Sequence, residues 1–320
     1  MKPLTVIAEG FWEGWDREQL RIDGTNEVGV GGGFVYKPGK AARLNGNYRY
    51  SHRTVDGYKT GNTPENPEAV GLVNYDWADR LRHKADLRFQ MIPLDALTVA
   101  LSGQYLNDEY GNDNLFGLKK NENYTGAIDI SYAVSEALSF YGNYVKEFRK
   151  GAMQSAAKDD AFDNPATAAN ETTIGGFNPE NYWNTDIYEK VNSFGVGATV
   201  QVIPSKLAVT TGYTYSSSKM DFNTINPNGA VKLANAAAQA WPTVRNRLQE
   251  VKTDISYTFT KNLKAGLTYV YEWYKLDDFT NTPAYMAGSS VENSTKYLFT
   301  GANNYSYDAH VAGAYLTYKF

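Results

Sequence analysis

The sequence contains no cysteine and no long run of apolar residues. Without cysteine the chain forms no disulfide, no thiolate metal site and no Cys-x-x-Cys-His attachment for covalent haem. A transmembrane helix needs about 20 consecutive apolar residues, so a helical membrane protein is excluded as well. The formal net charge of −4 over 320 residues is too small to indicate nucleic acid as a partner.

Aromatic residues and glycine are abundant instead. The chain has 25 Tyr, 14 Phe and 6 Trp beside 28 Gly. Tyr and Trp suit the boundary between membrane and water, where one end of the ring is wet. A barrel wall needs only every second residue to be apolar, so its mean hydropathy resembles that of a soluble protein. The composition therefore allows an outer-membrane β-barrel.

The C-terminus gives the most specific signal. The chain stops at Phe320, and counting back by twos gives Tyr318, Leu316, Ala314 and Ala312. A strand that runs to the last residue, with one apolar face and a terminal Phe, is typical of barrels in the outer membrane of Gram-negative bacteria. We predict Leu316, Tyr318 and Phe320 as the membrane-insertion strand, with membrane lipid and the outer-membrane barrel-assembly machinery as partners.

Tight turns and long polar segments alternate along the chain. Pro and Gly at several of the turns end strands and favour hairpin connections. Short turns on one side and long loops on the other are the asymmetry of bacterial outer-membrane barrels. The turns lie at 37–40, 93–95, 134–138, 203–206 and 259–263, and the long segments run roughly over 14–27, 53–79, 107–122, 150–186, 221–246 and 276–304.

We therefore predict an all-β fold, a transmembrane antiparallel up-and-down β-barrel in one domain over residues 1–320. Short turns face the periplasm and long loops face the outside, and an even number of strands puts both termini on the periplasmic side. A membrane-spanning sheet cannot leave an edge open to lipid, so the strands close on themselves or pair with strands of a longer chain. Twelve strands are expected at roughly 4–13, 28–36, 41–52, 80–92, 96–106, 123–134, 137–149, 187–203, 206–219, 247–260, 263–275 and 305–320.

The first ten residues bear on the same choice. They have neither the apolar core nor the small-residue cleavage site of a signal peptide. An outer-membrane protein must be exported. We expect either that the signal has been removed from this sequence or that the chain is the C-terminal portion of a longer barrel.

Alternation within the strands predicts which face is wet. From Arg80 to Met91 every even-numbered residue is polar or charged, and every odd one except His83 is apolar. Residues 250–259 follow the same rule for the polar phase, whereas 4–12 and the strand before His310 have no clean phase. A soluble antiparallel sandwich shows the same alternation, but strands of about 10–12 residues favour a barrel. Twelve charged side chains are then predicted to face the lumen: Arg43, Arg49, Arg80, Arg82, Lys84, Asp86, Arg88, Asp129, Glu250, Lys252, Asp254 and Lys264.

These eight cations and four anions leave two interpretations open. One is a water-filled pore whose charges pair across neighbouring strands. The other is a wall that holds an acidic or propionate-bearing partner inside the barrel. Charge alone does not separate them.

Residues that would indicate catalysis or metal binding are scarce. His52, His83 and His310 have no metal-ligand spacing, and no phosphate loop, zinc-protease helix or Walker motif is present. Acidic residues at 158–164 and 276–279 lack the spacing of an EF-hand. An outer-membrane phospholipase would need a Ser–His pair with an orienting partner, which makes an enzyme the third class of function. We predict no catalytic, metal-binding or cofactor-binding residue in this chain.

Several motifs, in their order along the chain, resemble one family. They are Tyr188–Thr199, Ile203–Leu207, Gly212–Tyr215, Leu248–Tyr257, Leu267–Phe279 and Asn303–Phe320. Together they resemble the C-terminal part of the decahaem-cytochrome-associated outer-membrane barrels of the MtrB/PioB type, most clearly over 187–320. Members of that family are longer, so the resemblance also implies that this chain is part of a larger barrel.

The resemblance implies a non-catalytic sheath for electron transfer. In the family the barrel surrounds a periplasmic multihaem c-type cytochrome in its lumen and lets it meet an outer-surface cytochrome, so that electrons cross the outer membrane. Haem would then be held only by the partner, in agreement with the absence of Cys. The competing class is an outer-membrane diffusion porin or solute channel.

Overall fold

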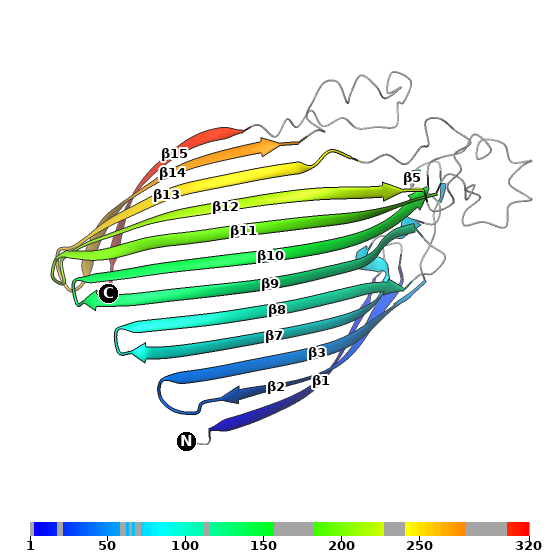
Figure 1. Ribbon diagram of the computed structural model, residues 1–320, viewed down its shortest axis with the longest axis horizontal. Helices are drawn as coiled ribbons and strands as arrows, with labels where there is room; N and C mark the ends of the chain where they lie inside the picture. Colours follow the sequence, from blue (N-terminus) through cyan, green and yellow to red (C-terminus); the bar gives the residue numbers. More distant parts are fainter. Residues whose placement is uncertain are drawn as a thin grey trace, which may run out of the picture.

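The computed structural model is built around one strongly curved, mainly antiparallel sheet (Figure 1). Five short turns join the strands at one end of the sheet, which we call the turn end, and we call the opposite end the loop end. The structure describes residues 3–17, 22–57, 62–63, 66–67, 72–73, 75–111, 116–156, 182–226, 241–278 and 306–319.

Twelve long strands follow one another across the sheet in the order of the sequence, each antiparallel to the next. This confirms the predicted all-β, up-and-down topology, and the five predicted turns lie where the strands are closely joined. The strands are β1 Leu4–Asp16, β2 Gly24–Tyr36, β3 Ala42–Asp56, β7 Asp79–Leu94, β8 Leu97–Gly111, β9 Phe116–Ser135, β10 Leu138–Ala156, β11 Tyr182–Ile203, β12 Leu207–Ile225, β13 Val244–Thr258, β14 Leu263–Asp277 and β15 Tyr307–Tyr318. The connection from β3 to β7 contains β4 Asn62–Thr63, β5 Asn66–Pro67, β6 Leu72–Val73 and the 3₁₀ turn η1 Tyr75–Trp77.

The prediction of a long loop is wrong for two segments, much of which is strand. Segment 14–27 holds the end of β1 and the start of β2, and segment 107–122 holds the end of β8 and the start of β9. A tilted strand crosses the hydrocarbon with about 9–11 residues, and beyond that length both of its faces meet water. Alternation then fades from the sequence although the backbone pairing continues, as in β11, which is 22 residues long.

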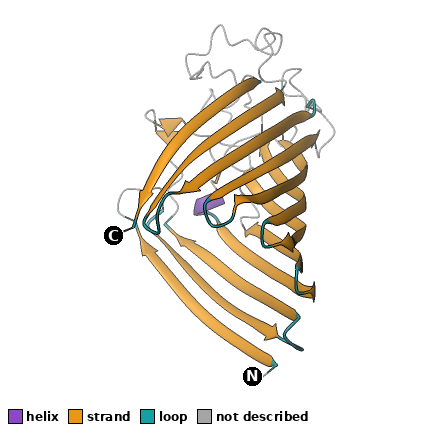
Figure 2. Ribbon diagram, turned by 90° about the vertical axis from the view of Figure 1, so that its left-hand side faces the viewer, coloured by secondary structure: helices purple, strands orange, loops and turns teal. Residues whose placement is uncertain are grey.

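The sheet is open along its two outer strands. Among the described residues, no hydrogen bonding joins β1 to β15, and the trough shape is seen from the turn end in Figure 2. Both edges carry unpaired backbone groups that would be costly in lipid. Closure of the strands on themselves or on further strands therefore stays a prediction.

The register gives the sheet one apolar and one polar face. Leu44, Phe89, Leu101, Ile128 and Tyr144 lie directly opposite one another on β3, β7, β8, β9 and β10. Residues directly opposite share a face, so a continuous apolar row crosses five strands. We call this side the apolar face and the other the polar face.

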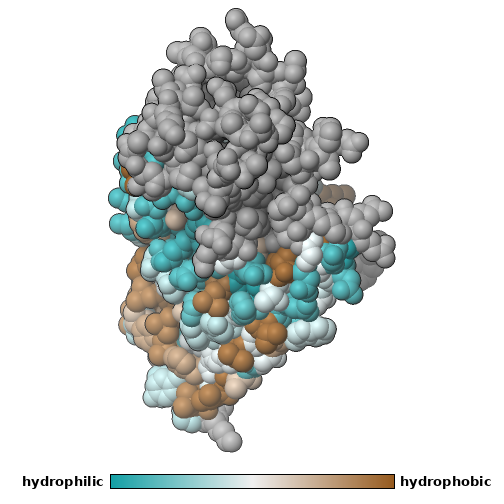
Figure 3. Space-filling view, turned by 90° about the vertical axis from the view of Figure 1, so that its right-hand side faces the viewer, coloured by the Kyte–Doolittle hydropathy of each residue, from teal (hydrophilic) through white to brown (hydrophobic). Residues whose placement is uncertain are grey.

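No described part of the chain covers the apolar face. Val6 is 73% exposed and Leu316 71% exposed, and Figure 3 shows hydrophobic side chains at the molecular surface. A bare apolar face of this extent does not suit water. Among the described residues, no helix is long and apolar enough to cross a membrane.

Aromatic side chains line both margins of the apolar face. The set near the turn end comprises Tyr36, Tyr132, Phe140, Tyr257 and Tyr318, and the set nearer the loop end comprises Tyr50, Tyr105, Phe148, Phe194, Tyr215 and Trp273. Such paired aromatic girdles mark the two interfaces of a membrane barrel. The two aromatic rows therefore mark where the sheet meets the two membrane–water interfaces.

The C-terminal strand β15 has the predicted residues Leu316 and Tyr318 on the apolar face. Leu316 lies opposite Ala265 and Tyr318 opposite Leu263, both on the apolar face. Phe320 lies outside the described residues. The role of this strand in membrane insertion stays a prediction.

Two of the three histidines on the apolar face, His83 and His310, are each hydrogen-bonded to a tyrosine of the neighbouring strand. Tyr48 Oη lies 2.7 Å from His83 Nδ1, and Tyr269 Oη lies 2.8 Å from His310 Nδ1. Each pair satisfies a polar ring on an otherwise apolar surface.

Removal of one of these hydroxyls is expected to cost stability. Tyr269→Phe leaves His310 Nδ1 without its partner, so we expect the free energy of unfolding to fall by about 1 kcal/mol. Urea unfolding in lipid vesicles measures the change. Tyr257→Phe, on the same face, is the control, and an equal loss in both variants would refute the role of the hydrogen bond.

The turn between β11 and β12 contains a left-handed residue that is not glycine. Lys206 N donates to Ile203 O at 3.0 Å, and Ser205 has φ of 61°. Pro204 at the second position and a positive φ at the third fit a type II turn, which favours Gly or Asn at the third.

Substitutions at Ser205 are therefore expected to separate by backbone preference. Ser205→Val should lower the free energy of unfolding by about 1–2 kcal/mol because a β-branched residue resists positive φ. Ser205→Gly should be neutral or stabilising. The same urea titration decides, and equal midpoints for the two variants would rule out this account of the turn.

Candidate functional site

The candidate site is the polar face of the sheet. Residues at the predicted phase share this face through the register: Arg88, for example, lies opposite Asn45 and Ser102, and Lys252 lies opposite Gly212 and Val270. All twelve charged residues singled out in the sequence lie on it, namely Arg43, Arg49, Arg80, Arg82, Lys84, Asp86, Arg88, Asp129, Glu250, Lys252, Asp254 and Lys264.

Near the loop end of β7 and β8 a charged pair is almost closed to solvent. Arg82 Nε donates to Asp108 Oδ1 at 2.6 Å, and Arg82 Nη2 donates to Oδ2 at 2.7 Å. The Asp108 side chain is 2% exposed and that of Arg82 is 31% exposed. Two parallel charge-assisted bonds fix the guanidinium in one plane.

A second pair spans β2 and β7 beside the first. Arg80 Nη2 donates to both carboxylate oxygens of Glu27 at 2.9 Å, and Ser51 Oγ donates to Glu27 Oε1 at 2.7 Å. The Arg80 and Glu27 side chains are 12% and 16% exposed. Arg80 Nε is buried with no hydrogen-bond partner among the described residues.

A third arginine ties the connection before β7 to the same rim. Arg53 donates to Ala78 O at 2.9 Å and to Tyr75 O at 2.7 Å. Three arginines thus stand beside two carboxylates. We call these five charged residues the rim cluster: Glu27, Arg53, Arg80, Arg82 and Asp108.

Glycines on the polar face of β2 let its neighbours reach across the strand. Glu9 on β1 accepts from Arg49 on β3 at 2.6 Å, and Gly31 lies between them in register. A Cβ on Gly31 would lie 2.7 Å from Glu9 Oε1. Arg49 also lies over the Phe11 ring, 5.1 Å from its centroid. Because Gly31 has no side chain, the Glu9–Arg49 ion pair can pass over β2 at this position.

Away from the rim the charges are more exposed and less paired. Arg43 donates to Asn45 Oδ1 at 2.9 Å, and Asp254 accepts from Thr268 Oγ1 at 2.7 Å. Within the parts of the sheet that the structure describes, no ion pair involves four further cations. These four unpaired wall cations are exposed on β7, β13 and β14: Lys84, Arg88, Lys252 and Lys264.

The family profile described as "Putative outer membrane beta-barrel porin, MtrB/PioB" matches residues 1–320 of this sequence. The chain belongs to this family. It is a β-barrel protein of the outer membrane, which confirms the family, the fold class and the location that the sequence predicts. No curated protein sequence matches it.

Solved outer-membrane proteins share the fold of this MtrB/PioB chain at low identity. They include "Copper transporter OprC" (TM-score 0.56, 7% identity, covering 98% of this chain and 42% of that one) and the ferric-catecholate import receptor Fiu of E. coli K12 in its closed form (0.60, 12%, 99% and 52%). BauA, the ferric preacinetobactin receptor from Acinetobacter baumannii, is similar (0.58, 11%, 98% and 45%). The chain spans about half the length of these proteins.

Several carboxylates on the polar face of the MtrB/PioB chain escape sequence reasoning: Glu9, Glu27, Asp108, Glu147, Glu189 and Glu272. Glu27 and Asp108 fall in segments predicted as loops, and Glu9 lies in a strand without a clean phase. Arg149 is missed as well, and it pairs with Glu189 at 3.2 Å. The residues around Arg149 are charged on both faces, so no alternation marks them.

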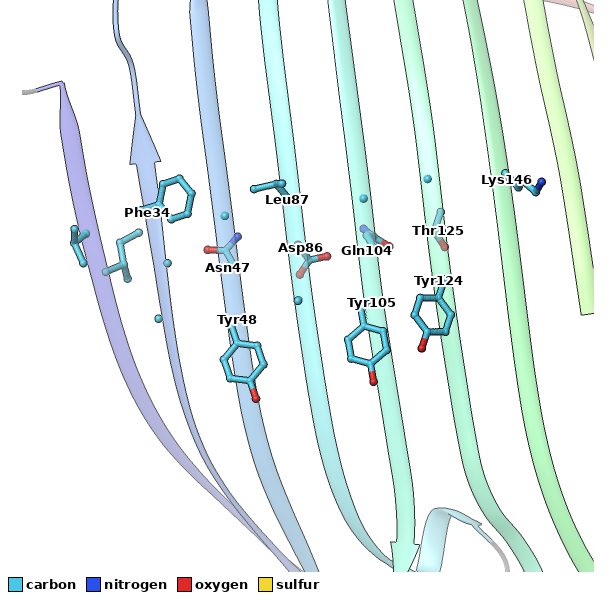
Figure 4. A pocket seen from close by; sticks show the side chains of 18 of the residues that line it. Phe34, Asn47, Tyr48, Asp86, Leu87, Gln104, Tyr105, Tyr124, Thr125 and Lys146 are labelled. Carbon is cyan, nitrogen blue, oxygen red and sulfur yellow. The ribbon is translucent and has the colours of Figure 1, made fainter. Parts of the chain in front are cut away.

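The apolar face carries a shallow depression of about 1100 Å³. Gly103 and Gly126 lie opposite one another in register, and Leu87 lies between Gly46 and Gly103. Figure 4 shows Tyr105 and Tyr124 beside this depression.

The acidic segment 158–164 lies outside the described residues. In the described chain no three His, Asp or Glu side chains are grouped closely enough to hold a metal ion.

Proposed function

We propose that this MtrB/PioB chain builds the wall of a non-catalytic outer-membrane barrel that sheathes a multihaem c-type cytochrome. The cytochrome enters from the periplasm and meets an outer-surface cytochrome, and electrons cross the membrane along their haems. The single observation that carries the proposal is the polar face, where ion pairs brace the loop end and unpaired cations lie along the rest of the wall. No haem is bound by this chain itself.

The unpaired cations of the wall support a fixed anionic occupant, and they stand among Asp86, Asp129 and Glu250, for which the described residues form no ion pair either. Pairs such as Arg82–Asp108 hold the rim rigid, whereas Lys84, Arg88, Lys252 and Lys264 are left for a partner. Haem propionates and acidic side chains are the anions that a cytochrome would present to them. A wall with these charges guides and retains such a protein without chemistry of its own.

Co-purification tests the proposal. The protein solubilised from outer membranes is expected to retain a haem-staining partner, and Lys84→Gln with Arg88→Gln and Lys252→Gln should release most of it at moderate salt. Lys37→Gln with Lys40→Gln and Lys206→Gln, at the short turns, is the matched control. A clean, haem-free wild-type protein would contradict the sheath.

A diffusion porin or solute channel is the second candidate. It is favoured by the family description and by a polar face that suits a water-filled lumen. A porin gives steady single-channel current in planar bilayers from haem-free protein. A sheath gives little current while its partner occupies the lumen, so the conductance of the purified complex separates the two.

A further inference from the structure

A group of cations lies on the apolar-face side of β10–β14, beyond the aromatic row toward the loop end. We call it the basic belt, and its members are Lys150, Lys190, Lys219, Arg245, Arg247 and Lys275. All but Lys150 are exposed, and Lys150 is half-buried, 5.5 Å from the centroid of the Tyr188 ring. The belt shares its face with Phe148 and Trp273, so it points away from the predicted lumen.

Like charges face each other directly in this belt. Lys190 lies opposite Lys219, Lys219 lies opposite Arg245, and Arg247 lies opposite Lys275. Like charges at directly opposite positions are destabilising. Three such pairs on four adjacent strands indicate that an anion neutralises them.

The described residues neutralise the belt only in part. Lys219 Nζ lies 2.8 Å from Asp221 Oδ2. Asp277 lies opposite Arg245 in register, yet no ion pair joins them, and Asp186 forms none with the belt either. Several exposed cations are therefore left for an external partner.

The distance of the belt from the turn end, counted in residues along each strand, shows which layer of the membrane surrounds it. Lys219 is 12 positions beyond Leu207, and Arg245 is 13 positions from Thr258, where their strands meet the short turns. The other members lie 11–13 positions along their strands. Since about 9–11 residues cross the hydrocarbon, these cations begin where the headgroups of the outer leaflet lie. Trp273, at 10 positions from Leu263, occupies the boundary below them.

The belt is confined to one half of the sheet. At the corresponding height on β1, β8 and β9 the same face carries Asp16, Glu109 and Glu122. Lys120 pairs there with Glu122 at 2.8 Å. A general excess of lysine near the loop end does not explain the belt.

We propose that the basic belt binds the phosphate groups of phosphorylated glycolipids in the outer leaflet of the outer membrane. Arginine and lysine are the donors that phosphate oxygens accept from, and arginine does so in a bidentate manner. The belt continues upward from an apolar face and an aromatic row that lipid covers. We therefore favour a lipid headgroup over an acidic protein as the anion that binds the belt.

The test measures binding of one defined lipid to the purified outer-membrane protein. The protein in detergent micelles is titrated with diphosphorylated lipid A and with the same lipid lacking phosphate, and bound lipid is counted by native mass spectrometry. The wild type is expected to bind the diphosphorylated form at least about tenfold more tightly. The triple variant Lys190→Gln, Lys219→Gln, Arg245→Gln should lose that preference.

Matched variants guard against a trivial loss. Lys37→Gln with Lys206→Gln and Lys261→Gln removes the same charge from the turn end and should bind as the wild type does. Lys190→Arg with Lys219→Arg keeps the charge and should keep binding. If the triple variant fails to fold, as judged by heat-dependent gel migration, Arg247→Gln with Lys275→Gln takes its place.

Two results would overturn the proposal. One is equal binding of the phosphorylated and dephosphorylated lipid by the wild type. The other is unchanged lipid preference in a folded belt variant, including the case in which that variant loses an acidic protein partner instead. Neither result depends on whether a cytochrome or water fills the lumen.

Discussion

Asp108→Ala is expected to lower the free energy of unfolding by about 3 kcal/mol, because it leaves the guanidinium of Arg82 partly buried without its carboxylate. The Asp108 side chain is 2% exposed and receives two short bonds. The one-third exposure of Arg82 keeps the expected loss at the lower end of the range for buried pairs. Reversible urea unfolding in lipid vesicles gives the value.

The control for this prediction is an exposed ion pair between a lysine and an aspartate. Asp221 pairs with Lys219 at 2.8 Å with both side chains well exposed, so Asp221→Ala should cost no more than about 1 kcal/mol. The double variant Arg82→Met, Asp108→Leu should recover most of the stability that Asp108→Ala loses. Similar losses for Asp108→Ala and Asp221→Ala would contradict a rigid, buried rim.

Leu101→Arg is expected to lower the stability of the inserted barrel by about 2–4 kcal/mol, because it places a charge in the middle of the lipid-facing surface. Leu101 is 43% exposed and lies in the apolar row between Phe89 and Ile128. Folding yield and urea midpoint in vesicles both report the effect.

The neighbouring residue supplies a matched control. Ser102 lies on the polar face opposite Arg88 and Ala127, so Ser102→Arg should change stability by less than about 1 kcal/mol. The two variants differ by one position on one strand. A larger loss from Ser102→Arg than from Leu101→Arg would reverse the assignment of the faces.

Strong alternation made most of the wall predictable. In β7 every second residue is charged or polar and the rest are apolar except His83, so the phase places Arg80 and Lys84 together on one face. Because successive side chains of a strand point to opposite faces, the alternation alone assigns each residue of β7 to a face. The sequence of β3 and β13 carries the same information.

The residues that the sequence did not reveal lie mainly at the ends of the strands, outside the hydrocarbon layer. Beyond the hydrocarbon the strands keep pairing, yet no lipid selects one apolar face, and Glu27 and Asp108 therefore sit in segments that look like loops. The pairing of Arg80 with Glu27 across an intervening strand depends on three-dimensional register, which one sequence does not display. Ser205 is similar, since its positive φ appears only once the turn is built.

The chain's lack of cysteine makes a direct test of the sheath possible. Single cysteines at Ser102 on the polar face and at Leu101 on the apolar face can each carry a thiol-reactive photocross-linker in outer membranes. The proposed sheath requires that Ser102→Cys cross-links to a haem-staining protein and that Leu101→Cys does not. Absence of any haem-staining adduct from Ser102→Cys, or an adduct from Leu101→Cys alone, would contradict it.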